Sequence, residues 1–230
     1  MSRATHAGPS IQPISGPEDF AAAFDVSRET LDQLLCYVAL LEQWQPRINL
    51  VAGTTLPDVW HRHVADSAQL LAFAPNAQTW LDLGSGAGFP GLVIAIMAHG
   101  RPGPRVTLIE SDRRKSAFLA EVARQTGISV EIHTARIEQI ATQRILSSVD
   151  VVSARALAPL VRLLPLSLPF FGDATLGLFP KGRDAESEVA QARADWVFDV
   201  ELTPSLTDAA ARIVAIRRPR ARTEGDARDR

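Results

Sequence analysis

The sequence predicts an α/β fold with a mainly parallel sheet, and three patterns support this prediction. From residue 79 onward, strand-like apolar segments alternate with helix-like segments, which is the order of βαβ units. A glycine-rich segment follows the first of these strands and opens a helix. The last two strand-like segments have no long helix between them, so we expect an antiparallel edge.

Two helical stretches are predicted before the sheet. The first has apolar residues at helical spacing, namely Leu31, Leu34, Leu35, Val38 and Leu41. Ser27 is its expected N-cap, and Pro46 is expected to end it. A second helix is predicted over residues 56–71. Residues 21–75 are therefore predicted to form an N-terminal helical cap.

Seven strands and five further helices are predicted next. The strands cover residues 80–83, 106–110, 130–133, 149–153, 176–179, 196–202 and 213–216. The helices cover residues 91–98, 113–125, 137–143, 156–164 and 184–194. Open parallel sheets bind ligands beyond the carboxyl ends of their strands, so we expect the chemistry in the loops after the strands.

The two ends of the chain show no apolar periodicity. Residues 1–20 are rich in Pro, Gly and Ser and are predicted to form a flexible arm. Residues 217–230 hold six Arg, two Asp and one Glu, and we predict a charged tail over residues 218–230. The α/β domain itself is expected to span residues 76–217.

Composition limits the class of function. The formal net charge is −2, which is not the strongly basic balance of a protein that grips naked nucleic acid through its phosphates. The single cysteine, Cys36, excludes an internal disulfide framework. No apolar run approaches the length of about 20 residues that spans a bilayer, and no signal peptide is evident, so we expect a cytoplasmic protein.

The clearest motif is the glycine-rich segment LDLGSGAGFPG at residues 81–91. Glycines let the backbone turn tightly and approach a ligand without a Cβ in the way. Asp82 stands near the strand end, where a cofactor amine or a loop N–H would have to offset the cost of burying its carboxylate. Glu110 ends the next strand, where a carboxylate can accept hydrogen bonds from both hydroxyls of a ribose.

A dinucleotide cofactor is the alternative ligand of this loop. Residues 86–91 fit the pattern Gly-x-Gly-x-x-Gly, which seats a pyrophosphate on a helix N-terminus. The pattern begins three or more residues past the strand, however, and Pro90 has no N–H to offer. A nucleoside cofactor without phosphates fits these residues better.

Several motifs resemble those of the bacterial small-subunit ribosomal RNA guanine-N7 methyltransferases, the glucose-inhibited division protein B family. They are INL at 48–50, RHVADS at 62–67, DLGSGAGFPG at 82–91, ES at 110–111, SARA at 153–156 and PKG at 180–182. The Gly-Phe-Pro-Gly end of the loop and the His-x-x-Asp-Ser element are specific, because most other methyltransferases of this fold lack them. The resemblance runs from about residue 34 to residue 216. Two departures are Val51, where the family has Thr, and Glu110, often Asp in relatives.

The resemblance implies a seven-stranded, Rossmann-like class I methyltransferase sheet and methyl transfer from S-adenosylmethionine to N7 of one guanine in 16S rRNA. The expected partner is 16S rRNA within the small ribosomal subunit or an assembly intermediate, with no membrane and no metal involved. The expected cofactor-binding residues are Asp82, Gly84, Gly86, Phe89, Glu110, Ile137, Glu138 and Arg155. The residues expected to be catalytic are Arg155, Lys181 and His63.

The residues agree with a ring-nitrogen acceptor. Guanine N7 carries a lone pair and no proton, so its attack needs positioning rather than a general base. Methylation of a cytosine carbon would need a thiolate, but Cys36 lies on the apolar face of the first long helix. The Asn/Asp-Pro-Pro-aromatic motif typical of exocyclic-amine methylation is replaced by residues 153–156 after the fourth strand.

Some roles and functions stay open. His63 and Asp66 share a helical face, either as a pair that fixes the cap onto the sheet or as a wall of the substrate pocket. His61 and His63 lie on different faces of the helix, so a metal bound by both is disfavoured. Basic residues after the strands suggest a phosphate-contacting rim: Arg113, Arg114, Lys115, Arg155, Lys181 and Arg183. Competing functions are a nicotinamide-dependent oxidoreductase, a non-catalytic RNA-binding or assembly factor and a small-molecule methyltransferase.

Overall fold

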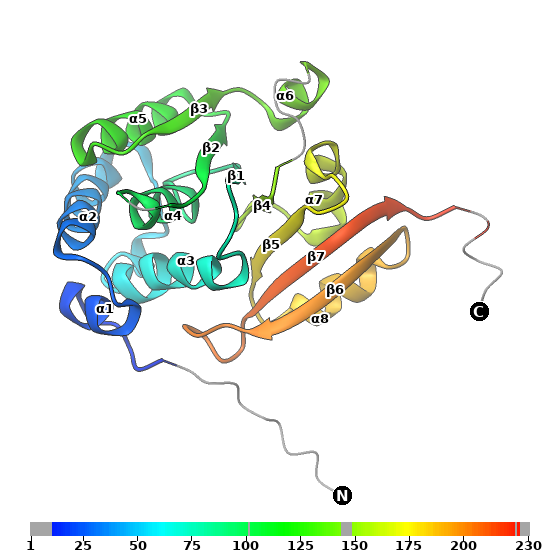
Figure 1. The fold of residues 1–230 in the computed structure, drawn as a ribbon, viewed down its shortest axis with the longest axis horizontal. Coiled ribbons are helices and arrows are strands. Elements are labelled where there is room, and N and C mark those ends of the chain that lie inside the picture. Colours follow the sequence, from blue (N-terminus) through cyan, green and yellow to red (C-terminus); the bar gives the residue numbers. More distant parts are fainter. Residues whose placement is uncertain (1–10, 101, 144–148, 224, 226–230) are drawn as a thin grey trace, which may run out of the picture.

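The computed structural model describes residues 11–100, 102–143, 149–223 and 225, and seven strands in these residues form one sheet (Figure 1). The strands are β1 Thr79–Leu83, β2 Arg105–Glu110, β3 Val130–Thr134, β4 Val151–Ser153, β5 Leu176–Lys181, β6 Trp196–Pro204 and β7 Arg212–Ala221. Their order is β3-β2-β1-β4-β5-β7-β6. β1 to β5 pair in parallel, and β7 runs antiparallel between β5 and β6. The predicted α/β sheet with an antiparallel edge is confirmed.

Helices cover both faces of this sheet (Figure 1). They include α1 Pro17–Phe24, α2 Arg28–Ile48, α3 Asp66–Ala68, α4 Gly91–Ala98, α5 Arg113–Thr126, α6 Ile137–Gln143, α7 Leu160–Ser167 and α8 Ala185–Ala192. Side chains of α2, α4 and α5 share one apolar core with the sheet, and side chains of α6, α7 and α8 share a second. α4 is apolar all round because it is enclosed, and only Ala98 among its residues escapes burial.

The long helix of the cap extends further than its sequence predicts. It begins at the expected N-cap, Ser27, whose hydroxyl accepts a hydrogen bond from the Thr30 N–H at 3.1 Å. Pro46 does not end it, because one missing N–H near the C-terminus removes a single helical bond. α2 instead continues to Ile48 and is closed by Asn49, which has a left-handed backbone (φ 44°).

The predicted helix over residues 56–71 is a chain of shorter turns. The 3₁₀ turn η1 (Gly53–Thr55) precedes it, and the π-helical turn η2 (Trp60–Ala65), α3 and the 3₁₀ turn η3 (Gln69–Phe73) follow one another without a break. π-helical turns are rare and occur frequently at functional sites. Within the described residues, no helix is long and apolar enough to cross a membrane.

Three other boundaries differ from the prediction. Residues 17–20 of the predicted arm belong to α1, which buries Phe20 completely. Residues 218–221 of the predicted tail continue β7, since Arg220 and Ala221 pair with β6. The helix predicted over residues 156–164 begins only at Leu160, because Ala156 has a left-handed backbone (φ 53°) and Pro159 disfavours a helical residue before it.

Candidate active site

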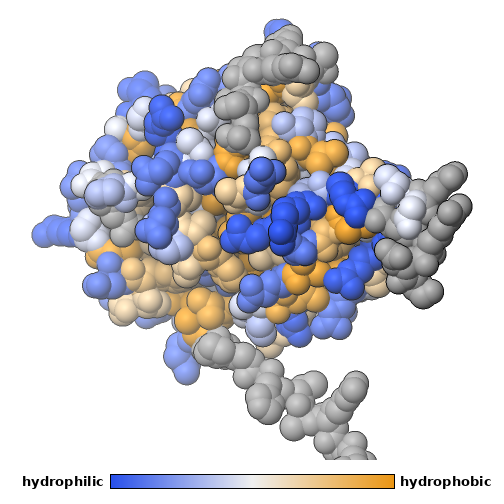
Figure 2. All heavy atoms as spheres, turned by 45° about the vertical axis from the view of Figure 1, so that its right-hand side comes forward, coloured by the Kyte–Doolittle hydropathy of each residue, from blue (hydrophilic) through white to orange (hydrophobic). Residues whose placement is uncertain are grey.

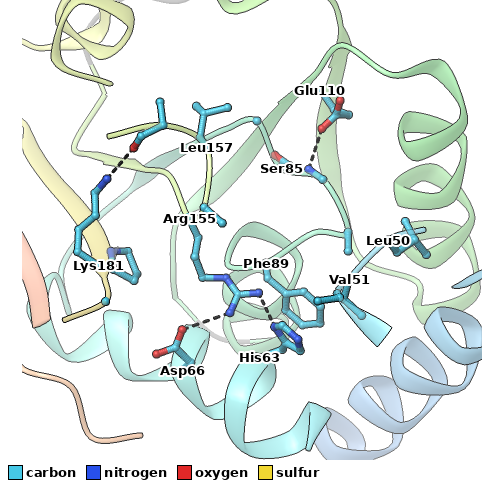
Figure 3. A pocket seen from close by; sticks show the side chains of 18 of the residues that line it. Leu50, Val51, His63, Asp66, Ser85, Phe89, Glu110, Arg155, Leu157 and Lys181 are labelled. Atoms are coloured by element: carbon cyan, nitrogen blue, oxygen red, sulfur yellow. Dashed lines mark hydrogen bonds and ion pairs between the residues drawn. The ribbon is translucent and has the colours of Figure 1, made fainter. Parts of the chain in front are cut away.

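An open cavity of about 1030 Å³ lies at the carboxyl ends of the parallel strands (Figure 3). Its walls come from the loops after β1 to β5, from the cap and from the turn between β6 and β7. This is the edge at which open α/β sheets bind ligands. The structure brings nine of the sequence-predicted residues to its walls: His63, Gly84, Gly86, Phe89, Glu110, Ile137, Glu138, Arg155 and Lys181.

The glycine-rich segment forms a tight loop between β1 and α4. Gly84 and Gly86 have φ values of 64° and 57°, in the left-handed region where a side chain is strained. The Ser85 N–H donates to the Ile109 carbonyl at 3.0 Å, which ties the loop to β2. A Cβ on Gly86 would meet nothing nearer than 3.7 Å, so this part of the loop turns bare backbone toward open space.

Asp82 lies beneath this loop, fully buried, rather than on the cavity wall. Its Oδ1 accepts a hydrogen bond from the Ser153 hydroxyl at 2.7 Å, and its Oδ2 accepts one from the Gly91 N–H at 3.3 Å. Trp80 donates from Nε1 to the same Ser153 oxygen at 2.9 Å. Burial raises the pKa of Asp82 to about 6, although these hydrogen bonds favour the ionised form. The carboxylate therefore fastens the loop and the start of α4 to the sheet.

Glu110 connects two loops at the cavity and is 7% exposed. Its Oε2 accepts a hydrogen bond from the Gly86 N–H at 2.8 Å (Figure 3). Its Oε1 accepts one from the Asp112 N–H at 2.7 Å. An ionised carboxylate can accept about four hydrogen bonds, so two bonds leave capacity for other donors. The geometry is thus compatible with the predicted contact to ribose hydroxyls.

Tyr37, which the sequence analysis did not single out, holds the loop from the other side. Its buried hydroxyl donates to the Ala87 carbonyl at 2.5 Å, and its ring lies 5.2 Å from that of Phe89. Burial raises the pKa of Tyr37 well above its ordinary value, so the hydroxyl remains a donor. The signal was present in the sequence, because the only tyrosine of the chain stands on the apolar face of α2.

Arg155, His63 and Phe89 form one cluster at the cavity wall (Figure 3). The Arg155 Nη2 donates to Nδ1 of His63 at 2.6 Å, and its guanidinium carbon lies 5.1 Å from the centre of the Phe89 ring. The imidazole stacks on the same ring, with the centres 5.0 Å apart. Burial, with the charges of Arg155 and Arg62, lowers the pKa of His63 to about 3. His63 is therefore neutral at physiological pH.

Asp66 anchors Arg155. Its Oδ2 accepts from the Arg155 Nη1 at 3.3 Å, and its Oδ1 accepts from the Thr207 hydroxyl and from the Gln69 amide, both at 2.9 Å. The carboxylate thus links the cap, the loop after β4 and the β6–β7 turn. His63 and Asp66 meet through Arg155, and both also line the cavity.

Lys181 is engaged within the protein. Its Nζ donates to the Ala158 carbonyl at 2.6 Å and lies 2.8 Å from Oε2 of Glu188. The same Glu188 oxygen accepts from the Leu160 N–H at 2.7 Å, at the start of α7. This network fixes the loop between β4 and α7, which carries Arg155 at its beginning. The structure therefore connects two of the predicted catalytic residues through one loop.

The cavity rim carries further basic residues. Arg62, Lys115, Arg136 and Arg212 line it, whereas the predicted rim residues Arg113, Arg114 and Arg183 do not. Ile137 and Glu138, at the start of α6, form the wall next to Glu110. Within the described part of the chain, no group of three or more His, Cys, Asp or Glu side chains is placed to hold a metal ion.

Three relatives that share one name are each more than half identical to this chain. "Ribosomal RNA small subunit methyltransferase G" of Parvibaculum lavamentivorans is 52% identical over 201 residues, covering 87% of this chain and 88% of that protein. The protein of the same name from Methylorubrum populi is 55% identical over 192 residues, covering 84% and 90%. The one from Rhodospirillum centenum is 56% identical over 191 residues, covering 83% and 85%.

Similarity to solved structures concerns the fold alone. A mutant of MtNAS in complex with S-adenosylmethionine superimposes with a TM-score of 0.51 at 15% identity, covering 88% of this chain and 84% of that chain. A fibrillarin/Nop5p complex gives a TM-score of 0.51 at 12% identity, covering 66% and 79%.

The family model described as rRNA small subunit methyltransferase G matches residues 30–214. The chain therefore belongs to the rRNA small subunit methyltransferase G family, as its motifs predict.

Proposed function

We propose that this chain transfers a methyl group from S-adenosylmethionine to N7 of a specific guanine in 16S rRNA of the small ribosomal subunit. The proposal rests on one observation in a chain of this family. The glycine loop is hydrogen-bonded to Glu110, and both line the same cavity as the Arg155–His63–Phe89 cluster. The volume of about 1030 Å³ leaves room for a nucleoside cofactor and a target base together.

The residues at the cavity fit S-adenosylmethionine. Gly84 and Gly86 turn bare backbone toward the ligand, and the Glu110 carboxylate can accept from ribose hydroxyls. Ile137 offers an apolar contact for the adenine, with Glu138 and Phe89 nearby on the wall. We assign Asp82 a supporting role beneath the loop, because it is fully buried there. The cofactor supplies an electrophilic methyl group on a sulfonium sulfur.

The chain itself supplies position and a charged setting. Guanine N7 has no proton to remove, so the acceptor needs no general base. His63 agrees with this, because Arg155 donates to its Nδ1 and its Nε2 lies 2.8 Å from the Thr55 hydroxyl, so both ring nitrogens are engaged within the protein. We propose that Arg155 orients substrate or cofactor at the reaction site, with His63 and Lys181 fixing the cap and the loop around it.

The test is the methylation state of 16S rRNA from a strain that lacks the protein, read by nucleoside mass spectrometry and compared with the complemented strain. We expect one N7-methylguanine to disappear and to return with the wild-type gene. The purified protein should restore it on small subunits from the deletion strain. A methyl group on a carbon or exocyclic nitrogen, or cofactor binding without transfer, would contradict the proposal. Cys36→Ser serves as a control that keeps activity, since the chemistry needs no thiolate.

A further inference from the structure

The second half of β7 carries a basic surface that the proposed reaction does not use. Arginine stands at four of the six positions from 217 to 222. β7 pairs Ile216 with Gly177, near the start of β5, so the positions after Ile216 lie at the amino-terminal edge of the parallel strands. The cavity lies at the opposite edge, about 20 Å away along the six residues of β5.

A β-bulge brings two of these arginines to one face. Val197 of β6 pairs with Arg220, and Asp199 pairs with Arg217. Between these pairs β6 has one residue, 198, and β7 has two, 218 and 219, which defines the bulge. Val197 and Asp199 are two apart and share a face, and residues directly opposite each other in a sheet also share a face. Arg217 and Arg220 therefore project from the same face, which a regular strand would not allow for positions three apart.

Arg218 sits in the bulge with a left-handed backbone (φ 51°). This conformation is unfavourable for a residue with a Cβ, and glycine or asparagine would adopt it more easily. Its side chain reaches the same face, where Nε donates to Oδ2 of Asp199 at 2.8 Å. The two side chains are 71% and 58% exposed, so water screens this ion pair and it contributes little to stability. The Arg218 guanidinium, which also donates to Asp199 from Nη2, therefore remains accessible from solvent.

The side chains of Arg217, Arg218 and Arg220 are exposed. Trp196 and Phe198, on the opposite face of β6, are buried in the core that includes α8, so the face with Arg217 and Arg220 is turned away from that helix. Figure 2 brings this side of the molecule forward and shows strongly hydrophilic side chains gathered among hydrophobic ones. Among the described residues of β6, Asp199 and Glu201 are carboxylates on this face.

We infer that Arg217, Arg218 and Arg220, here called the ribbon arginines, bind the phosphate backbone of 16S rRNA at a distance from the methylated guanine. The inference rests on the proposed function and adds a second contact to it. Guanidinium groups pair with phosphate oxygens in a charge-assisted, often bidentate manner. An RNA that occupies both this surface and the cavity must span the sheet, so a large folded RNA binds more tightly than a short oligomer. A protein with a net charge of −2 needs such local basic surfaces to hold RNA.

The test compares Arg217→Ala/Arg220→Ala with Arg28→Ala/Arg124→Ala, which removes two exposed arginines from α2 and α5. Dissociation constants are measured for protein-free 16S rRNA and for small subunits from the deletion strain, each over a range of KCl concentrations, with S-adenosylhomocysteine present. The ribbon variant is expected to bind both about ten-fold more weakly. Its slope of log K against log salt is expected to fall by about 1.4–1.8, for two lost phosphate contacts. Its kcat and its affinity for S-adenosylhomocysteine are expected to match wild type.

Arg218→Gly separates binding from folding. Glycine relieves the left-handed strain, so the variant is expected to melt at or above the wild-type temperature while RNA affinity falls several-fold. Wild-type affinity and salt slope in both ribbon variants would overturn the inference. So would a loss seen with small subunits but not with protein-free 16S rRNA, because the partner would then be a ribosomal protein. Wild-type protein that binds 16S rRNA through these arginines without methylating it would overturn the proposed function alone.

Discussion

The guanidinium of Arg155 donates from Nη2 to Nδ1 of His63 at 2.6 Å, and this contact fixes the tautomer of the histidine. Since Nδ1 accepts, the proton resides on Nε2, which donates to the Thr55 hydroxyl at 2.8 Å. That hydroxyl donates in turn to the Ala52 carbonyl at 2.8 Å. Arg155, in the loop after β4, is thereby connected to η1 of the cap, and a proton on Nδ1 would break the connection.

Arg155→Lys is expected to lower kcat/KM for small subunits about ten- to a hundred-fold, a loss of about 1.5–3 kcal/mol. The ammonium keeps the charge but lacks the planar fork that reaches Asp66 and His63 at once. Steady-state kinetics measure the effect, with Arg162→Lys on the exposed side of α7 as the control. Wild-type efficiency in Arg155→Lys would show that the cluster does not set the rate.

The buried neutral histidine predicts a pH dependence of stability. The pKa of His63 is about 3 in the folded protein and 6.5 in an unfolded chain, so the unfolded state binds the extra proton between these values. The contribution of this group is fully present above pH 6.5 and is lost as the pH falls toward 3, by up to about 1.4 kcal/mol per pH unit. His63→Gln, which cannot titrate, is expected to lose less stability on acidification.

Asp82 titrates with the opposite sign and must be separated from this effect. Its pKa of about 6 in the folded protein lies above the unfolded value of 3.8, so its contribution is present below pH 3.8 and is lost as the pH rises through 6. The free energy of unfolding is measured in urea for wild type and His63→Gln at pH 4.5 and 7.5. Both proteins contain Asp82, so its contribution cancels when one free energy is subtracted from the other at each pH. An equal difference between the two proteins at both pH values would contradict a neutral His63.

Gly84→Ala is expected to weaken binding of S-adenosylmethionine at least ten-fold, and Gly127→Ala is its control. Both glycines have left-handed backbones, with φ values of 64° and 70°, so each substitution costs about 1–2 kcal/mol of backbone strain. A Cβ at 84 would come within 2.6 Å of Cδ1 of Leu157 on the cavity wall, whereas a Cβ at 127 meets nothing within 4 Å. Calorimetry that gives both variants the same affinity would refute a role of this contact in binding.

Local sequence patterns predicted the elements well, because strands and helices follow from apolar periodicity over a few residues. All seven predicted strands are present, and α6 has the predicted bounds. The segment over residues 56–71 was predicted as one helix, whereas it contains the π-helical turn η2 and the 3₁₀ turn η3. The start of α7 was missed because a left-handed residue other than glycine, here Ala156, has no composition signal.

The site residues were predicted as a set, but their contacts were not. The sequence identified Asp82 as close to the glycine loop, whereas the structure shows its side chain beneath that loop, bound to Ser153. Contacts such as Thr207 to Asp66, 141 positions apart, depend on how the β6–β7 turn packs against the cap. A single sequence contains no pattern that pairs such distant residues, so the anchoring of Arg155 became visible only in the fold.

The hydrogen bond from Tyr37 to Ala87 joins two residues 50 positions apart, and its removal tests most directly how the glycine loop is held in place. Tyr37→Phe keeps the ring beside Phe89 but removes the hydroxyl that donates to the Ala87 carbonyl at 2.5 Å, and Ala87 lines the cavity. The lost bond is expected to destabilise the protein by about 1–3 kcal/mol, because the carbonyl stays buried without this donor. Since Ala87 belongs to the glycine loop, S-adenosylmethionine is expected to bind several-fold more weakly in a protein that still folds.

Thr126→Val is the matched control for Tyr37→Phe. It also removes a buried hydroxyl that donates to a backbone carbonyl, that of Val122 at 2.7 Å, but at the far end of α5 from the loop. Chemical denaturation is expected to show a loss of stability in both variants, and calorimetry is expected to show weaker cofactor binding only in Tyr37→Phe. Because burial keeps the pKa of Tyr37 well above its ordinary value, the difference in affinity should be the same at pH 7 and pH 9. Equal cofactor affinity in wild type and both variants would mean that Tyr37 stabilises the core without shaping the loop.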